Sequence, residues 1–262
     1  MPGAVAPGME QHERAKETPH AKLFLLEGGP VRPLMVVLPG GGYGCRAAHE
    51  ADPVAEWFNG LGLHALVCHY RVFPWHHPAP LSDAQRAVRL ERHHAAAWQV
   101  DPARIGVLGF SAGGHLAASV ANFGDDGDAA SADPVARHSS RVQALVACYA
   151  VISNGPFGHR GSFANLLGPD PDPALARRLS LETSVTAANP PAFLWHTAGD
   201  AGVPVANSLL YAQALAAAKV PFSLHVYPDG RHGLGLGRDH PGTAREWTRA
   251  CEAWLRELGW AR

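Results

Sequence analysis

Short apolar runs alternate with longer amphipathic segments along most of the chain. Six runs rich in apolar and β-branched residues are bounded by Gly, Pro, Asp or Asn, and each is predicted to be a buried strand. They are LMVVL (34–38), LHALVCHY (63–70), RIGVLGF (104–110), QALVACYA (143–150), AFLWHTA (192–198) and FSLHVYP (222–228). The pattern therefore predicts strands separated by long connections.

Several of those connections have helical spacing. The clearest are 81–100, 204–220 and 243–258. Ser82 and Asp83 are suited to cap the start of the first segment. The last segment places Trp247, Cys251, Trp254 and Leu255 on one face. We therefore expect a helix over each of the three segments.

Repeated alternation of strand and helix predicts an α/β fold, with a mostly parallel central sheet and helices on both faces. The connection over 151–191 lacks a central strand and is rich in Gly, Pro and Asp, so we expect it at one end of the sheet. With 262 residues and 47% hydrophobic composition, the chain can bury one large core. We predict a flexible, polar N-terminal segment over 1–20 and a single domain over 21–262.

The charge balance excludes several classes of partner. Lys and Arg together number 22 and Asp and Glu 23, so no global field attracts nucleic acid, an anionic membrane or a highly charged substrate. A small or neutral substrate fits this balance. The sequence specifies no oligomeric state.

The four cysteines lie far apart without a CxxC pair, which suits a reducing compartment. The N-terminal residues lack the basic start and apolar run of a secretory signal, and no run of about 18 apolar residues occurs. We therefore expect a soluble, cytoplasmic protein.

Three glycines in a row, in VVLPGGGYGC, follow the first predicted strand. The stretch 42–47 matches the dinucleotide-binding pattern G-x-G-x-x-A. That interpretation requires an acid near the end of the next strand to hold a ribose, and 61–77 contains neither Asp nor Glu. A tight turn in which the glycines only permit positive φ is the simpler alternative.

A second motif indicates a catalytic role for the glycine loop. Gly109-Phe110-Ser111-Ala112-Gly113 has the G-x-S-x-G pattern and stands between a predicted strand and an Ala-rich helix. In such an elbow the serine occupies a strained turn that exposes its hydroxyl, and the helix N-terminus beneath it favours developing negative charge. Ser111 is therefore predicted to be a nucleophile rather than a structural N-cap.

A serine hydroxyl needs a base and an orienting carboxylate, which follow such an elbow in the order acid, then histidine. Asp200 comes just after a predicted strand, although it could instead cap the helix that begins near Pro204. His232 lies in a Gly-rich loop after the last predicted strand. Its rivals are weaker, because His225 lies within a strand and His240 precedes a proline. We predict Ser111, Asp200 and His232 as the catalytic triad.

The sixteen histidines also raise the question of a metal site. The adjacent pairs 76–77 and 93–94 have diverging side chains, and neither HExxH nor a Cys/His array occurs. The second pair fits a favourable interaction with a helix C-terminus. We expect no catalytic metal and no cofactor.

Attack by a serine on a carbonyl carbon creates a tetrahedral oxyanion, which needs backbone N–H donors close to Ser111. One donor is the residue after the nucleophile, Ala112, and others come from a glycine loop of the HGGG type. PGGGY stands in that place. We therefore predict an oxyanion hole made by Gly41, Gly42 and Ala112, with Pro39 replacing the usual histidine.

Taken together, five stretches resemble the bacterial serine esterases of the α/β-hydrolase superfamily that are described as acetyl esterases or acetyl xylan esterases. The stretches are LPGGGY, YRVFPWHHPAPLSDAQRAVRL, DPARIGVLGFSAGGHLA, GDAGVPVANSLLYAQAL and GRHGLG. The resemblance implies a carboxylesterase that deacetylates acetylated sugars. Because the N-terminal residues lack the features of a secretory signal, we expect imported acetylated oligosaccharides, rather than polymeric xylan, as its substrates. Two alternatives stay open: a small peptidase or arylformamidase, and a catalytically silent binding protein on this fold.

Short loops must form the substrate pocket, because no amphipathic insertion long enough for a lid interrupts the pattern. The candidate pocket residues are Tyr43, Trp75, Phe157, His159 and Arg160. Tyr43 and Phe157 are suited to close a small acyl slot and the other three to contact a sugar, although each also fits ordinary loop packing. Cys45, beside the oxyanion loop, is interpreted as a packing residue.

Overall fold

The computed structural model describes residues 18–261 and is built around a seven-stranded sheet with the strand order β1-β3-β2-β4-β5-β6-β7. The strands are β1 (His20–Phe24), β2 (Arg32–Leu38), β3 (His64–His69), β4 (Val100–Phe110), β5 (Ala144–Cys148), β6 (Ala192–Thr197) and β7 (Phe222–Tyr227). Only β1 is antiparallel to its neighbour. The predicted mostly parallel sheet is confirmed.

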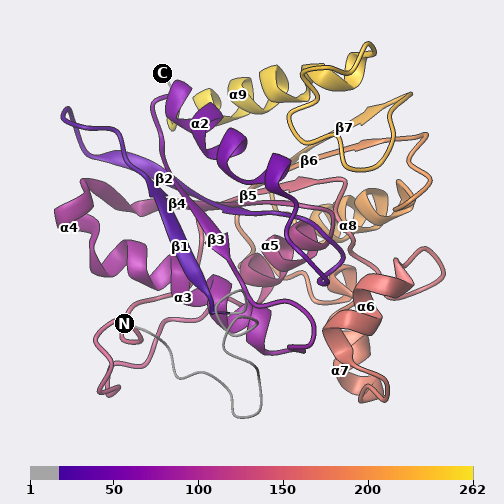
Figure 1. Ribbon diagram of the computed structural model, residues 1–262, viewed down its shortest axis with the longest axis horizontal. Helices are drawn as coiled ribbons and strands as arrows, with labels where there is room; N and C mark the ends of the chain where they lie inside the picture. The colour runs from indigo at the N-terminus through magenta and orange to yellow at the C-terminus, as the bar shows by residue number, and fades with distance from the viewer. Residues whose placement is uncertain (1–17, 262) are drawn as a thin grey trace.

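Helices cover both faces of the sheet (Figure 1). On one face lie α2 (Asp52–Gly60) and α9 (Trp247–Glu257), and on the other lie α3 (Ala79–His93), α5 (Ser111–Phe123) and α8 (Ala206–Ala217). The shorter helices are η1 (Ala48–Glu50), α4 (Ala95–Trp98), α6 (Arg160–Leu167), α7 (Pro173–Arg178), η2 (Leu181–Thr183) and η3 (Thr243–Glu246).

Strand β2 explains how one apolar run serves both layers. Side chains alternate along a strand, so Leu34 and Val36 pack in the core beneath α3 and α5, whereas Met35 and Val37 pack in the core beneath α2 and α9. All four side chains are completely buried. Apolar residues on both faces therefore give the continuous run that the sequence shows.

The first strand, β1, was not predicted from the sequence. Its residues are mostly exposed, because it pairs only with β3 at the edge of the sheet, and its pattern is too polar to resemble the six predicted runs. At the opposite edge β7 is present where predicted, but the prediction that it is buried is wrong, because it pairs only with β6 and leaves Phe222 and Val226 exposed. The predicted flexible segment 1–20 lies outside the described residues except for 18–20, and His20 already belongs to β1. The division into this segment and one domain stays a prediction.

The predicted helix over 81–100 is wrong in its bounds. Helix α3 begins at Ala79, α4 ends at Trp98, and Val100 already belongs to β4. Asp83 does not cap α3. Its carboxylate instead accepts hydrogen bonds from the backbone N–H and the guanidinium of Arg71, at 2.7–2.8 Å, because a guanidinium offers paired, charged donors.

The other two predicted helices are present with shorter bounds. Helix α8 occupies the middle of 204–220, and 243–258 begins as η3 before continuing as α9. The predicted apolar face of α9 is buried, and the Trp247 indole stacks on that of Trp195 with ring centroids 4.9 Å apart. Among residues 18–261 there is no helix whose length and apolar character would suffice to cross a membrane.

The connection over 151–191 contains no strand and carries α6, α7 and η2. It contacts the end of the sheet at which β2 finishes, because the Asn165 side chain donates a hydrogen bond to the carbonyl of Gly42 at 2.9 Å. In addition, the backbone N–H of His77 donates to the carbonyl of Leu166 at 2.7 Å. This connection therefore borders the glycine loop, as the sequence predicted for one end of the sheet.

Candidate active site

Strand β4 passes directly into α5 at Ser111. Phe110 is extended, whereas Ser111 has a positive φ of 54°, a conformation that is strained for a residue other than glycine. The flanking glycines leave no room for a side chain. A Cβ at Gly109 would lie 2.0 Å from the carbonyl oxygen of Gly113, and a Cβ at Gly113 would lie 2.1 Å from that of Leu38. The strand and the helix can therefore meet this closely only with glycine at both positions.

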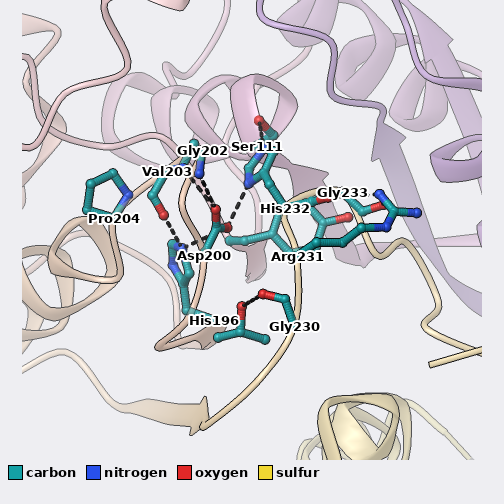
Figure 2. A network of polar contacts seen from close by, with 12 residues as sticks. Ser111, His196, Asp200, Gly202, Val203, Pro204, Gly230, Arg231, His232 and Gly233 are labelled. Carbon is teal, nitrogen blue, oxygen red and sulfur yellow. Dashed lines mark hydrogen bonds and ion pairs between the residues drawn. The ribbon is translucent and has the colours of Figure 1, made fainter. Parts of the chain in front are cut away.

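The three residues selected from the sequence lie in hydrogen-bond contact (Figure 2). Ser111 Oγ lies 2.7 Å from His232 Nε2, and His232 Nδ1 lies 2.7 Å from Asp200 Oδ2. With a neutral imidazole, the Ser111 hydroxyl donates to Nε2 and Nδ1–H donates to the carboxylate. The His232 side chain is 28% exposed and that of Asp200 only 1%. The imidazole is therefore accessible while the carboxylate behind it is sealed from water.

Asp200 uses its two carboxylate oxygens differently. Oδ1 accepts the backbone N–H groups of Gly202 and Val203, both at 2.9 Å, while Oδ2 faces His232. Burial tends to raise the pKa of Asp200, but hydrogen bonds from His196, His232 and Val203 hold this pKa well below its usual range. The alternative of a helix cap is partly right, because Asp200 binds the turn that precedes α8, although α8 itself has Val205 at its N-cap.

His196 was not recognised from the sequence. It is fully buried in β6, and its Nε2 lies 2.9 Å from the Val203 carbonyl oxygen and 3.4 Å from Asp200 Oδ2. Its Nδ1 lies 2.8 Å from Ser208 Oγ. The imidazole thus connects β6 to the turn that carries Asp200 (Figure 2) and, through Ser208, to α8. A histidine four residues before the candidate acid, inside a buried strand, was the available signal.

The two rival histidines have partners elsewhere. His225 Nε2 lies 2.9 Å from Ser223 Oγ, and its ring stacks on that of Phe193. His240 Nε2 lies 3.2 Å from the Asp229 carbonyl oxygen. Of the histidines in residues 18–261, His232 is the one that hydrogen-bonds Ser111.

The glycine loop forms a turn beside Ser111. Gly41 and Gly42 both have positive φ, and within the described residues their N–H groups donate to no acceptor. Ala112, in the first turn of α5, has no intrahelical acceptor for its N–H. These three donors are therefore available to an oxyanion, and their role stays a prediction. The loop leads into η1 rather than directly into a long helix, unlike a dinucleotide-binding turn.

Cys45 is an exposed free thiol whose Sγ lies 3.6 Å from the Gly41 carbonyl oxygen. The same carbonyl accepts the backbone N–H groups of Gly44 and Cys45 at 3.0 and 3.1 Å. The thiol contacts the turn of the glycine loop but is accessible to solvent, so its interpretation as a packing residue stays a prediction.

Tyr43 lies in the core, not on the wall of a cleft, which corrects its expected place in an acyl slot. Its side chain is 1% exposed, and its hydroxyl lies 2.8 Å from His115 Nδ1. The ring packs edge-on against those of Tyr70 and His115. An aromatic ring is stabilised more by burial in the core than by a position in an exposed loop, and this explains why Tyr43 is buried.

The other four predicted pocket residues lie in the connection after β3, in the connection after β5 and at the start of α6. Phe157 is 46% exposed, and Arg160 is exposed at the start of α6. Trp75 is half-buried, with the Arg71 guanidinium 5.1 Å above its ring. His159 is the N-cap of α6, where its Nδ1 accepts the backbone N–H of Ser162 at 3.2 Å, and burial lowers its pKa.

His115 links Tyr43 to the carbonyl of Leu179, to which its Nε2–H donates at 2.8 Å. Complete burial lowers the pKa of His115 from the usual 6.5 to about 4, so the folded protein keeps this imidazole neutral. At a pH between about 4 and 6.5, His115 binds a proton in the unfolded chain but not in the folded chain. The contribution of neutral His115 to the free energy of unfolding is therefore fully present above pH 6.5 and is lost as the pH falls toward 4.

We expect His115→Gln to reduce the loss of unfolding free energy between pH 6.5 and 4 by roughly 2–3 kcal/mol, because glutamine does not titrate. Urea unfolding at several pH values measures this loss. His69, whose pKa is also lowered to about 4, mainly by burial, keeps its own contribution in both proteins. Equal pH dependence in the variant and the wild type would contradict the prediction.

The architecture is that of the α/β-hydrolases, since the elbow stands after a central parallel strand and the acid and the histidine follow two later strands. A solved acetyl ester-xyloside bifunctional hydrolase from Caldicellulosiruptor lactoaceticus is 50% identical, with a TM-score of 0.92, and the match covers 94% of this chain and 90% of that one. The carboxylesterase Cest-2923 from Lactobacillus plantarum is 26% identical, with a TM-score of 0.76 and coverage of 93% and 94%.

The BD-FAE family model matches residues 27–215, and the chain belongs to this family. The chain is also 36% identical to endo-1,4-beta-xylanase B of Butyrivibrio fibrisolvens over 226 residues, which are 84% of this chain and 35% of that protein. It is 30% identical to an acetylxylan esterase of Xylanibacter ruminicola over 231 residues, 86% and 44% of the two chains. The chain thus spans less than half of the length of these two relatives.

Proposed function

We propose that this protein is a serine carboxylesterase that removes acetyl groups from acetylated sugars, with xylo-oligosaccharides as the substrate class. The observation that carries the proposal is the hydrogen-bonded chain from Ser111 through His232 to the buried Asp200. The substrate class is supported by the hydrolase that is 50% identical and is described as acting on acetyl esters and xylosides.

In the proposed reaction Ser111 Oγ attacks the acetyl carbonyl carbon while His232 Nε2 takes the hydroxyl proton. The carbonyl oxygen becomes an oxyanion, which accepts hydrogen bonds from Gly41, Gly42 and Ala112. Collapse of this intermediate breaks the ester bond, and His232 returns the proton to the departing sugar oxygen. Water, deprotonated by His232, then attacks the acetyl-enzyme and releases acetate.

Asp200 supports both halves of this cycle. Its carboxylate fixes the imidazole with Nδ1 protonated, so that Nε2 can accept, and it stabilises the imidazolium that forms. The depressed pKa of Asp200 keeps the carboxylate ionised over the working pH range. The backbone donors of Gly202 and Val203 hold the carboxylate in place.

We also propose a small acyl slot, formed by the short loops around Ser111. We expect kcat/KM to fall by about tenfold or more from acetyl to butyryl 4-nitrophenyl esters, and octanoyl esters to be nearly inert, because extra methylenes in filled space cost about 1–3 kcal/mol. Steady-state kinetics with the three esters measure this order. Values that rise with chain length would contradict an acetyl esterase and favour a lipase.

Two enzyme alternatives share this triad chemistry, namely a small peptidase and an arylformamidase. Parallel assays with an acetylated xylo-oligosaccharide, a peptide amide and an N-formyl aryl amine separate them. We expect acetate release from the sugar to have the largest kcat/KM. No turnover of any of the three substrates, or of 4-nitrophenyl acetate, would favour the silent binding protein.

We also propose a cytoplasmic location. The four cysteines are all free thiols, and three of them are buried, which is usual where thiols are kept reduced. A cytoplasmic enzyme would act on imported oligosaccharides.

A further inference from the structure

A buried acid that the proposed reaction does not use lies behind the glycine loop over 39–43, which carries the predicted donors Gly41 and Gly42 and is called the oxyanion loop below. Glu50, at the end of η1, is 2% exposed. Its Oε2 accepts the backbone N–H of Gly40 at 2.8 Å, and its Oε1 accepts the hydroxyl of Tyr149 at 2.6 Å. Both carboxyl oxygens are thus committed to groups that border the candidate active site, as a buried carboxyl group requires.

Tyr149 continues this contact to the loop that carries His232. It follows β5 directly, and its hydroxyl oxygen accepts the backbone N–H of Gly235 at 2.8 Å. Its ring packs edge-on against the imidazole of His232, with centroids 5.1 Å apart and planes at 71°. Burial and the neighbouring Glu50 raise the pKa of Tyr149 well above its usual value, so the hydroxyl stays protonated and donates to Glu50.

Two local features show how tightly this arrangement is packed. Tyr149 has a positive φ of 35°, which a bulky side chain adopts only when its surroundings impose it, and its N–H donates to the Trp195 carbonyl at 2.7 Å. Gly40 has no space for a side chain, since a Cβ there would lie 2.7 Å from Glu50 Oε2 and 3.1 Å from Ser111 Cβ. The Gly40 amide is thus held directly beside the nucleophile.

The neighbouring residue makes a second connection between the same two loops. His49 Nε2 lies 3.0 Å from the carbonyl oxygen of Gly233 and 3.6 Å from Glu50 Oε1. Helix η1 is therefore linked to the His232 loop twice, directly through His49 and indirectly from Glu50 through Tyr149.

We propose that Glu50 and Tyr149 form a brace, in which these two positioning residues hold the oxyanion loop, through Gly40, and the His232 loop, through Gly235, at a constant separation around Ser111. The inference rests on the proposed function. Oxyanion donors and a general base must each lie within about 0.5 Å of their productive positions, so a link between the two loops bears on kcat rather than on substrate binding.

Tyr149→Phe tests the brace, because it removes both hydrogen bonds of the hydroxyl and keeps the ring against His232. We expect kcat for an acetyl ester to fall about 10- to 100-fold with KM within about twofold of the wild type. Hydrogen–deuterium exchange is expected to accelerate in peptides that cover 39–47 and 231–236. Glu50→Gln retains a carbonyl acceptor for Gly40 N–H, so its loss of kcat should be smaller than that of Glu50→Ala.

The matched control is Tyr211→Phe. The Tyr211 hydroxyl is also buried and donates to Asn122 Oδ1 at 2.7 Å, far along the chain from both loops. We expect this variant to lose some stability while its kcat, and the exchange of the two loops, stay as in the wild type. The brace is overturned if Tyr149→Phe matches Tyr211→Phe in kcat, or if exchange in the two loops does not change.

The two proposals fail in different ways. If the wild-type protein hydrolyses no ester, the proposed function fails, and exchange then decides whether the brace holds the two loops. If the wild type is an active esterase but Tyr149→Phe retains full kcat, the brace fails and the proposed function stands.

Discussion

Ser111→Ala is expected to lower kcat/KM for 4-nitrophenyl acetate by about 10⁴-fold or more, with the fold unchanged. The substitution removes the atom that forms the bond to the acyl carbon, and neither His232 nor the oxyanion donors replace it. The side chain is small and 8% exposed, so its loss leaves no large cavity. Steady-state kinetics measure the effect, and circular dichroism with thermal unfolding tests the fold.

Ser119→Ala is the matched control, since Ser119 lies on the same helix, is also buried, and donates its hydroxyl to the His115 carbonyl at 2.8 Å. It should retain wild-type activity. A fluorophosphonate should label Ser111 in the wild type and in Ser119→Ala, as mass spectrometry of the peptides can establish. If Ser111→Ala kept more than about a hundredth of the wild-type rate, the assignment of the nucleophile would fail.

Asp200→Asn is expected to lower kcat by about 10³- to 10⁴-fold with little change in KM. An amide that presents its N–H₂ to His232 favours the tautomer with Nε2 protonated, which cannot accept the Ser111 proton. The neutral side chain also no longer stabilises the imidazolium. Because hydrogen bonds hold the pKa of Asp200 well below its usual range, protonation of this group does not limit the wild-type rate at mildly acidic pH.

Asp229→Asn provides the comparison for this charge change. Asp229 is exposed and lies three residues before His232, so its substitution should leave kcat within about twofold of the wild type, as for surface positions in general. Kinetics of both variants with 4-nitrophenyl acetate measure the difference. A kcat for Asp200→Asn within about tenfold of the wild type would show that Asp200 does not orient the base.

Much of the fold could be predicted because the signals are local. A strand buried on both faces is mostly apolar, so β2 to β6 are visible as largely apolar runs, although β6 also buries His196. Strand β1 has no such run, because its side chains are mostly exposed at the sheet edge. The predicted start of α3 is wrong because Asp83 has the residue type of a helix cap, but its carboxylate instead accepts hydrogen bonds from Arg71 in the preceding loop.

The sequence by itself determined the α/β architecture, the elbow at Ser111, and the choice of Asp200 and His232 from their order and their loops. Only the tertiary structure decided that Tyr43 is buried against His115, that His196 stands behind Asp200, and that Glu50 and Tyr149 connect two loops of the site. Glu50 and Tyr149 are 99 positions apart in the chain, and Tyr149 and Gly235 are 86 apart. Periodicity and motifs report interactions between near neighbours, whereas these contacts exist only because parallel strands bring their carboxyl ends to one edge of the sheet.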